Sequence, residues 1–180
     1  FRSVAGVNST NLTATLNDQF GNTAKAATDT VITPSSSSSG ANKHFRTTGN
    51  ANATTFTITT GNSSVSFRYY DEKAGSWSFT FTNDQALTNP GAYAFTINAA
   101  TASTYVISGA SSATAGVNST NLTATLVDAF GNTATFGADV VITPSSSSSG
   151  ANKHFRTTGN ANATTFTITT GNSSVSFRYY

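Results

Sequence analysis

Two stretches of this chain are identical over 40 residues, because residues 31–70 recur unchanged as residues 141–180. The same spacing of 110 positions relates the segment GVNSTNLTATL at residues 6–16 to its second occurrence at residues 116–126. Such a period exceeds the roughly 20–50 residues of solenoid and propeller repeats and suits a whole small domain. We therefore expect a tandem repeat of one independently folding unit of about 110 residues.

The repeat register places a domain boundary near Ser103, so we predict one domain over residues 1–102 and a second over residues 103–180. On this division the first domain lacks an opening strand, which residues 105–109 supply to the second, and the second lacks the closing strands of residues 71–99. Two interpretations stay open: the missing strands lie outside this window of a longer polypeptide, or a neighbouring subunit supplies them. The first is favoured, because donation needs a free extension and this chain carries those closing strands only in its middle.

The composition limits the classes of function. Charged residues make up 9% of the chain, whereas soluble domains average about 25%. Cysteine is absent, which excludes disulfides, thiolate nucleophiles and thiolate metal sites. We expect no nucleic-acid partner, because lysines and arginines form no cluster, and no membrane span, because no apolar run approaches about 20 residues. This composition fits an extracellular or cell-surface location.

Apolar and polar residues alternate along several short segments, which is typical of β-strands with one buried face. Gly, Asn and Pro separate these segments, as turn residues do. We predict an all-β fold of tandem immunoglobulin-like β-sandwich domains, with seven or eight strands per unit and the alternating aromatics as the core. The expected strands are residues 12–16, 31–33 with Pro34 at the end, 56–58, 65–70, 77–81 and 93–97, and residues 104–108 begin the next domain.

The segments TNLTATLVDAFGNTAT at residues 120–135 and TTFTITTGNSSVSFRYYDEKAGSW at residues 54–77 resemble a known family. They are similar to bacterial immunoglobulin-like repeats of large surface proteins, the group that includes invasin- and intimin-type adhesin domains. The resemblance covers the whole repeat and implies tandem extracellular stalk domains without catalytic residues. In the first repeat, Asn17 and Gln19 depart from the pattern, where the second has Val127 and Ala129.

The turn DAFGN in the second repeat predicts a tight reversal between strands. We expect Asp128 to accept backbone N–H bonds, Phe130 to close the end of the sandwich, and Gly131 with Asn132 to take positive φ. The alternative is calcium at a domain junction, although the chain offers few of the six to eight oxygens that calcium takes. We expect no metal and no cofactor; the acids that such a site would use are Asp18 or Asp128 with Asp71, Glu72 or Asp84.

Cationic and aromatic residues interleave at one place in each repeat, in the sequence NKHFR. One interpretation is a contact surface for carbohydrate, an anionic polymer or the next domain. The other, which we favour, is an edge strand whose cations prevent pairing with foreign strands. A single histidine per repeat is a poor metal site or catalytic base. The candidate contact residues are Lys43, His44 and Arg46 in the first repeat and Lys153, His154 and Arg156 in the second.

We expect no enzymatic activity. The chain has no G-x-S-x-G nucleophile motif. A glycosidase needs two carboxylates that face one cleft, and Glu72 is the one glutamate of this chain. An intramolecular amide bond through Lys43 or Lys73 stays open.

Eight N-x-S/T sequons predict a glycoprotein, although Asn, Ser and Thr are abundant enough for such triplets to arise by chance. Sugar would supply hydration that the few charges do not. The candidate sites are Asn8, Asn11, Asn52, Asn62, Asn118, Asn121, Asn162 and Asn172.

These observations predict a structural segment of an extracellular fibre or adhesin stalk, with neighbouring copies of the repeat as its partners. Two alternatives remain: a module that binds cell-surface carbohydrate through the NKHFR segment, and a lateral surface-layer or sheath polymer with strand exchange between subunits.

Overall fold

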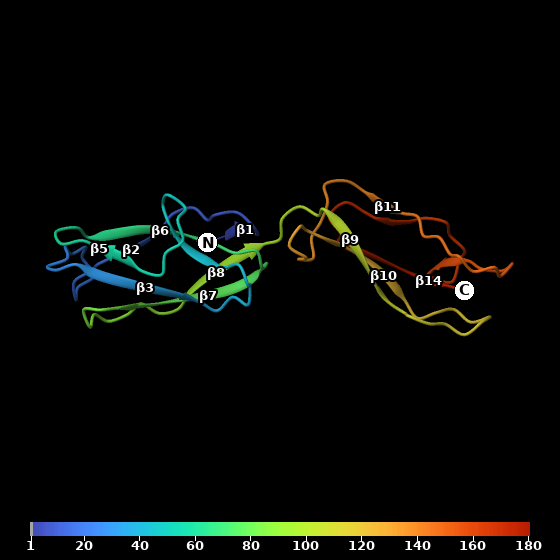
Figure 1. Cartoon of the computed structure of the whole chain (residues 1–180), viewed down its shortest axis with the longest axis horizontal. Coiled ribbons are helices and arrows are strands. Elements are labelled where there is room, and N and C mark those ends of the chain that lie inside the picture. The colour runs from blue at the N-terminus through green and yellow to red at the C-terminus, as the bar shows by residue number, and fades with distance from the viewer. Residues whose placement is uncertain (1) are drawn as a thin grey trace. The chain divides into compact units, whose positions relative to one another are not determined.

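The computed structural model describes residues 2–180, which contain β-strands and no helix (Figure 1). The prediction of an all-β fold is confirmed. The chain packs as two compact units, unit 1 over residues 1–99 and unit 2 over residues 100–180. Since residues 2–180 contain no helix, none of them forms a helix that could cross a membrane.

Unit 1 contains eight strands: β1 (Arg2–Val4), β2 (Leu12–Thr15), β3 (Thr30–Ser36), β4 (His44–Thr47), β5 (Phe56–Ile58), β6 (Ser64–Tyr70), β7 (Gly75–Asn83) and β8 (Tyr93–Asn98). They form a five-stranded sheet in the order β1-β8-β7-β3-β5 and a three-stranded sheet in the order β2-β6-β4. Neighbouring strands are antiparallel except β1 and β8, which are parallel.

The core of unit 1 lies between these two sheets. Phe67 and Tyr69 of β6 are 2% and 0% exposed, and Phe79 of β7 and Phe95 of β8 are 0% and 1% exposed. The ring centroid of Tyr69 lies 4.6 Å from that of Phe79 and 5.8 Å from that of Phe95. Burial of a phenylalanine side chain contributes about 1.5–3 kcal/mol relative to exposure. The alternating aromatics therefore join the two sheets into one sandwich.

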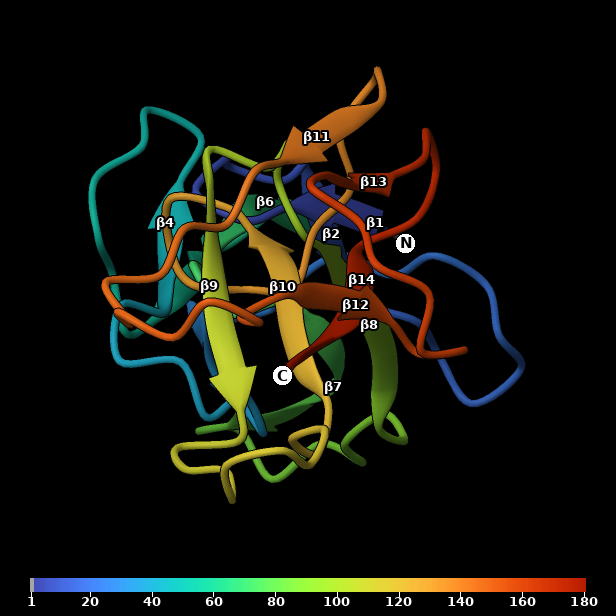
Figure 2. The same cartoon turned by 90° about the vertical axis from the view of Figure 1, so that its right-hand side faces the viewer.

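Unit 2 contains six strands: β9 (Thr104–Gly109), β10 (Leu122–Val127), β11 (Val140–Ile142), β12 (Phe155–Thr157), β13 (Phe166–Ile168) and β14 (Ser174–Tyr179). One sheet has the order β12-β14-β10-β9 and the other pairs β11 with β13, all antiparallel. Figure 2 shows β9 beside β10. By position in the repeat, β10, β11, β12, β13 and β14 correspond to β2, β3, β4, β5 and β6.

Strands β3 and β11 show one sequence adopting two lengths of strand. Residues 31–36 and 141–146 are identical, yet β3 continues through Pro34 to Ser36, whereas β11 ends at Ile142. The longer strand pairs with β7 over five residue pairs, and the described part of unit 2 has no counterpart of β7. The expectation that the strand ends at its proline is therefore wrong for unit 1, because a neighbouring strand supplies the ladder beyond it.

The turn after β2 and its counterpart after β10 form as predicted except for their phenylalanine and asparagine: the positive φ expected at Asn132 is found only at Gly131, with a φ of +80°. Asp18 Oδ1 accepts the backbone N–H groups of Phe20 at 2.9 Å and Asn22 at 2.8 Å, and Gly21 has a φ of +85°. Phe20 is 80% exposed and its counterpart Phe130 is 41% exposed, so the prediction that this ring closes the sandwich is wrong. The aspartate side chain occupies the inside of the turn, which leaves the ring on the outside.

Two identical positions with different burial provide a test of the core. The hydroxyl of Tyr69 contacts Ser36 Oγ at 2.8 Å and donates to the buried Asp71 side chain at 2.8 Å. Its counterpart Tyr179 is half-buried, and its hydroxyl contacts Ser146 Oγ, the counterpart of Ser36, at 2.8 Å. We expect Tyr69→Phe to lower the free energy of unfolding of unit 1 by about 1–3 kcal/mol, since a buried carboxylate loses a donor. Tyr179→Phe should cost unit 2 less than about 1 kcal/mol.

Denaturant unfolding followed through assigned NMR signals of each unit measures both losses. Equal losses for the two substitutions would contradict the view that packing against the five-stranded sheet of unit 1 creates the buried environment of Tyr69.

Candidate interaction surfaces

The cationic segment predicted to lie on an edge strand does so in part: β4 contains His44 and Arg46, β12 contains Arg156, and both strands end their sheets. Lys43, Lys153 and His154 lie before these strands. The lysines of the segment are engaged within their own loops. Lys43 Nζ donates to the backbone oxygens of Ser38 at 2.6 Å and Gly40 at 3.3 Å, and Lys153 Nζ donates to the backbone oxygen of Ser148. These two lysines therefore fasten a serine-rich loop to the strand.

Arg46 of β4 is held by two asparagines and an aromatic ring. Its Nε donates to Asn52 Oδ1 at 2.9 Å and its Nη1 to Asn8 Oδ1 at 2.9 Å. The guanidinium carbon lies 4.0 Å from the ring centroid of Tyr70, and the ring of His44 stacks 6.5 Å from that ring. A cation–π contact of this kind contributes about 0.5–1 kcal/mol at an exposed site.

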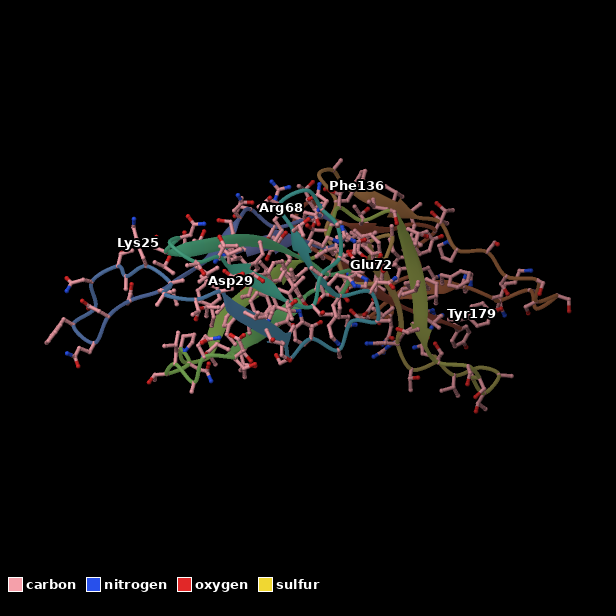
Figure 3. All side chains as sticks on the ribbon, turned by 60° about the vertical axis from the view of Figure 1, so that its left-hand side comes forward. Lys25, Asp29, Arg68, Glu72, Phe136 and Tyr179 are labelled. Carbon is pink, nitrogen blue, oxygen red and sulfur yellow. The ribbon has the colours of Figure 1, made fainter. Side chains whose placement is uncertain are left out.

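Arg68 of β6 lies directly opposite Arg46 in the antiparallel register, on the outer face of the three-stranded sheet (Figure 3). Its Nε donates to Asn11 Oδ1 and its Nη1 to Asn50 Oδ1, both at 2.9 Å. Asn8 Nδ2 also donates to Asn50 Oδ1 at 3.0 Å, and Asn50 has a φ of +71°, which asparagine tolerates better than most residues.

Directly opposed like charges destabilise a sheet, and here neutral amide oxygens surround both guanidinium groups. We call this set the arginine–asparagine cluster; in unit 1 it comprises Asn8, Asn11, Arg46, Asn50, Asn52 and Arg68.

The arginine–asparagine cluster recurs in unit 2 with nearly the same geometry. Arg156 donates to Asn162 at 2.9 Å and Asn118 at 3.1 Å, and Arg178 donates to Asn121 at 2.9 Å and Asn160 at 3.0 Å. The guanidinium carbon of Arg156 lies 3.8 Å from the ring centroid of Tyr180. Unit 2 builds the cluster without counterparts of β7 and β8 in its described residues, so the cluster requires neither of those strands.

Sequence reasoning found only part of this cluster. It singled out Arg46 and its counterpart but missed Arg68 and Asn50 with their counterparts. The available signal was the two-residue period of β6, which places Arg68 on the outer face between buried Phe67 and Tyr69. The pairing of β6 with β4, which brings the two arginines together, comes from the tertiary fold.

In unit 1, Glu72 bonds to Tyr70, the tyrosine that packs against Arg46 of the arginine–asparagine cluster. The Tyr70 hydroxyl donates to Glu72 Oε1 at 2.8 Å, and Asn42 Nδ2 donates to Glu72 Oε2 at 2.7 Å. The bond from Asn42, followed by that from Tyr70, lowers the pKa of Glu72 from its ordinary value of 4.5. The bond to Glu72, followed by burial, raises the pKa of Tyr70.

The sequons lie on the surface in two kinds of environment. Asn11 and Asn52 accept arginine bonds through Oδ1, which leaves this interaction compatible with sugar on Nδ2. Asn8 and Asn62 use Nδ2 as a donor, to Asn50 and Thr59 respectively, so sugar there would replace a hydrogen bond. Glycosylation stays a prediction at these positions and at their counterparts Asn118, Asn121, Asn162 and Asn172.

The acids considered for calcium serve other contacts. Residues 2–180 contain no group of three or more His, Cys, Asp or Glu side chains that could hold a metal ion. Asp71 is fully buried and accepts the Tyr69 hydroxyl and, at 2.8 Å, the backbone N–H of Lys73. At Asp128, burial acts to raise the pKa, but hydrogen bonds from Asn132 and from backbone amides give a net lowering.

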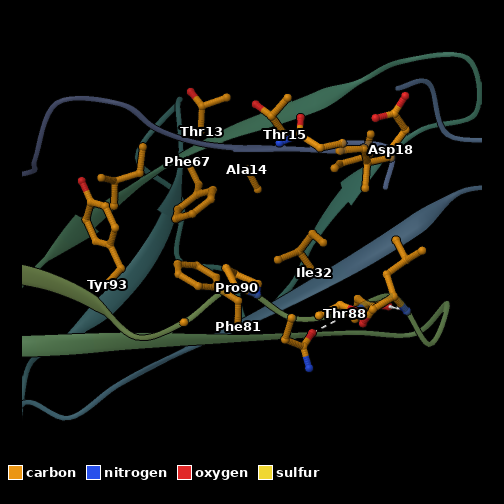
Figure 4. Close-up of a pocket in the computed structure, with 18 of the residues that line it drawn as sticks. Thr13, Ala14, Thr15, Asp18, Ile32, Phe67, Phe81, Thr88, Pro90 and Tyr93 are labelled. Atoms are coloured by element: carbon orange, nitrogen blue, oxygen red, sulfur yellow. Dashed lines mark hydrogen bonds between the residues drawn. The ribbon is translucent and has the colours of Figure 1, made fainter. Parts of the chain in front are cut away.

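Unit 1 also contains a groove of about 930 Å³ along β2, which sequence reasoning missed. Figure 4 shows Ala14 of β2 pointing into it, opposite Phe81 of β7 and Pro90. Tyr93 also borders the groove and is 38% exposed, although its strand period predicted an inward position. We call this feature the β2 groove; its apolar lining includes Leu12, Ala14, Leu16, Ile32, Ile58, Phe67, Phe81, Leu87, Pro90 and Tyr93.

No protein family matches the sequence, and no curated protein matches it significantly. Among solved structures, the chain is similar to domains 1–6 and domains 4–9 of the surface layer protein SbsC, with TM-scores of 0.38 and 15% and 16% identity. Those matches cover 94% and 96% of this chain but 20% and 26% of the SbsC chains.

A third match, to domains 5–6 of the S-layer protein SbsC, has a TM-score of 0.34 and 16% identity and covers 95% of this chain and 79% of that one.

The contacts of Glu72 predict a measurable titration. We expect carboxyl ¹³C NMR to give Glu72 a pKa below 4.5 and Asn42→Ala to raise it, because the amide donor favours the charged form. With a depressed folded-state pKa, the resulting stabilisation is present above the ordinary value of 4.5 and is lost as the pH falls through the folded value. Ala41→Ser, at a neighbouring exposed position, is the control; a pKa unchanged by Asn42→Ala would contradict the assignment.

Proposed function

We propose that this chain is a segment of an extracellular fibre or adhesin stalk built from tandem immunoglobulin-like domains, with residues 1–102 and 103–180 belonging to successive domains. The repeated sequence supports this proposal, because both units build the same edge strand, turn and arginine–asparagine cluster from it. The sparse charge and the abundant Ser, Thr and Asn fit an extracellular location. The proposal assigns no enzymatic activity to the chain.

The parallel pairing of β1 with β8 is the structural observation that most strongly supports the proposal. These strands are the first and last of unit 1, and their register joins Arg2 to Thr96 and Val4 to Asn98. The backbone N–H of Ala5 adds a bond to the oxygen of Asn98 at 2.8 Å. A force that pulls the start of β1 away from the end of β8 slides the two parallel strands past each other. Their hydrogen bonds then bear the load together, as a stalk domain requires.

Force spectroscopy on Ala5→Pro tests this load path. Ala5 precedes Gly6, whose φ is +76°, in a turn closed by the bond from Val7 N–H to the Val4 oxygen. Proline suits that position of such a turn, but it removes the N–H that bonds to Asn98. We expect unit 1 to unfold at a lower force, while its free energy of unfolding falls by about 1–3 kcal/mol, because the bond is lost and Ala5, which is 2% exposed, lies in the core that the larger proline ring must enter.

Ala115→Pro is the matched control, because Ala115 occupies the same position before Gly116 in unit 2 and lies outside any strand. We expect no change in its unfolding force. An unchanged unfolding force in Ala5→Pro would argue against a load-bearing role for the β1–β8 pair.

A module that binds an anionic or carbohydrate surface polymer is the second candidate function. The opposed arginines of each arginine–asparagine cluster favour it, since each guanidinium has five N–H donors and two of these bond to asparagine. Stacking of sugar on Tyr70 is disfavoured, because Arg46 already covers that ring. A lateral surface-layer polymer is a third arrangement of the same units, which imaging of the native assembly would distinguish from single-file stalks.

Titration with a sulfated polysaccharide separates the binding module from the stalk. If the clusters bind anions, saturable binding should weaken at least about tenfold in the double variant Arg46→Ala and Arg156→Ala, and with rising salt. The stalk alone predicts no saturable binding. The double variant Lys25→Ala with Lys73→Ala, which removes two exposed cations outside the clusters, is the charge-matched control.

A further inference from the structure

The β2 groove follows an edge strand that carries no charge. The backbone N–H of Leu16 donates to the oxygen of Ser63 beside β6 at 2.8 Å. Because backbone groups alternate in direction along a strand, Thr13 and Thr15 direct theirs toward the groove. Edge strands exposed to solvent usually carry charges that prevent pairing, as β4 does at the other edge of this sheet with Arg46. The sequence of β2, LTAT, has no such protection.

Unit 2 shows what lies beside the same sequence. The segment NLTATL of β2 recurs at β10, where β9 pairs with it in antiparallel register. Ile107 lies opposite Ala124 and Tyr105 lies opposite Leu126. The backbone N–H of Ser103 continues the ladder by donating to the oxygen of Val127 at 2.9 Å.

The added strand changes the burial of its neighbours. Ala124 and Leu126 are 0% and 4% exposed beside β9, whereas their counterparts Ala14 and Leu16 are only half-buried at the groove. The segment before β9 also covers the following turn: Ala100 N–H donates to Asp128 Oδ2 at 3.0 Å, and Asp128 is 2% exposed. Its counterpart Asp18 is exposed.

The side chains of β9 fit the lining of the groove. Residues opposite one another in an antiparallel pair project from the same face, so Tyr105 and Ile107 share the core face of Ala124 and Leu126. They are 47% and 51% exposed in unit 2, whose described residues include no counterpart of β7 and β8 to cover them. Unit 1 has those strands, and Phe81 of β7 forms the facing wall of the β2 groove.

We propose that the β2 groove holds one further antiparallel strand with the sequence pattern of Thr104–Gly109, and that this strand belongs to the same polypeptide on the N-terminal side of Phe1. The alternating Tyr and Ile of that pattern would fill the groove beside Leu16 and Ala14, and its backbone would pair with Thr13 and Thr15. The inference holds whether the array acts as a stalk or as a binding module.

The connection to β2 supports this source. Residues 116–122 between β9 and β10 are identical to residues 6–12, and Phe1 corresponds to Ser111. A strand joined directly before Phe1 would therefore reach β2 through a connection of the same length as in unit 2. A second copy is a poorer source, because its own β9 already pairs with β10.

A graft tests the proposal on the full chain. The sequence of residues 100–110, ATASTYVISGA, is joined directly before Phe1, and amide hydrogen exchange is measured by NMR. We expect exchange at Thr13 and Thr15 to slow at least about 100-fold, because the amides enter a ladder within a packed sandwich. Thr123 and Thr125, which already face β9, serve as references in the same spectrum and should not change.

The control graft carries Tyr105→Asp and Ile107→Asp in the added segment only and should leave exchange at Thr13 and Thr15 fast. The grafted segment and its control can also be added as free peptides to the unaltered chain, and exchange at Thr13 and Thr15 is then measured without changing the covalent chain. The proposal is overturned if neither the graft nor the free peptide slows these amides, or if the control segment protects them equally. Protection in the unaltered chain that grows with its concentration, together with dimers in sedimentation, would assign the groove to a second copy and contradict the N-terminal source.

Discussion

Pairing between strands is the interaction on which the rest of this structure depends. A strand needs a neighbour for its backbone groups and a facing sheet for its apolar side chains. Residues 31–36 pair with β7 in the same sheet and face the sheet of β2, β6 and β4, and they form one long strand. The identical residues 141–146 have no counterpart of β7 beside them, and their strand ends at Ile142. The same rule governs Leu12, which is 7% exposed against the complete second sheet of unit 1, while its counterpart Leu122 is half-buried.

Features that need neither β7 nor β8 are insensitive to this difference. The arginine–asparagine cluster forms in both units with matching distances, because β4 and β6, or β12 and β14, supply its arginines and the loops around them, which both units contain, supply its asparagines. Neutral asparagine oxygens allow two arginines to lie opposite each other without a carboxylate in the cluster. Such a surface suits a chain of sparse charge, since it presents cations that are held in fixed positions by uncharged groups.

The sequence predicted those parts of the fold that local patterns encode. The two-residue period of β6 identified Phe67 and Tyr69 as buried, and the DAFGN pattern predicted the turn bonds of Asp128, which Asp18 also forms. It failed where the outcome depends on a distant strand, at the extent of β3 and at the β2 groove, and it also failed at the ring of Phe20, which points outward from a turn filled by Asp18. Residues 31–36 and 141–146 carry the same letters, so no local rule could assign them different structures.

Amide hydrogen exchange at the identical residues Ser37 and Ser147 tests the central claim most directly. Ser37 N–H donates to the oxygen of Ser78 at 3.0 Å at the end of the ladder with β7, and Ser147 has no β7 counterpart beside it in residues 100–180. If partner strands decide the structure, Ser37 should exchange at least about tenfold more slowly than Ser147 in the same sample. Equal exchange rates at the two serines would contradict the account.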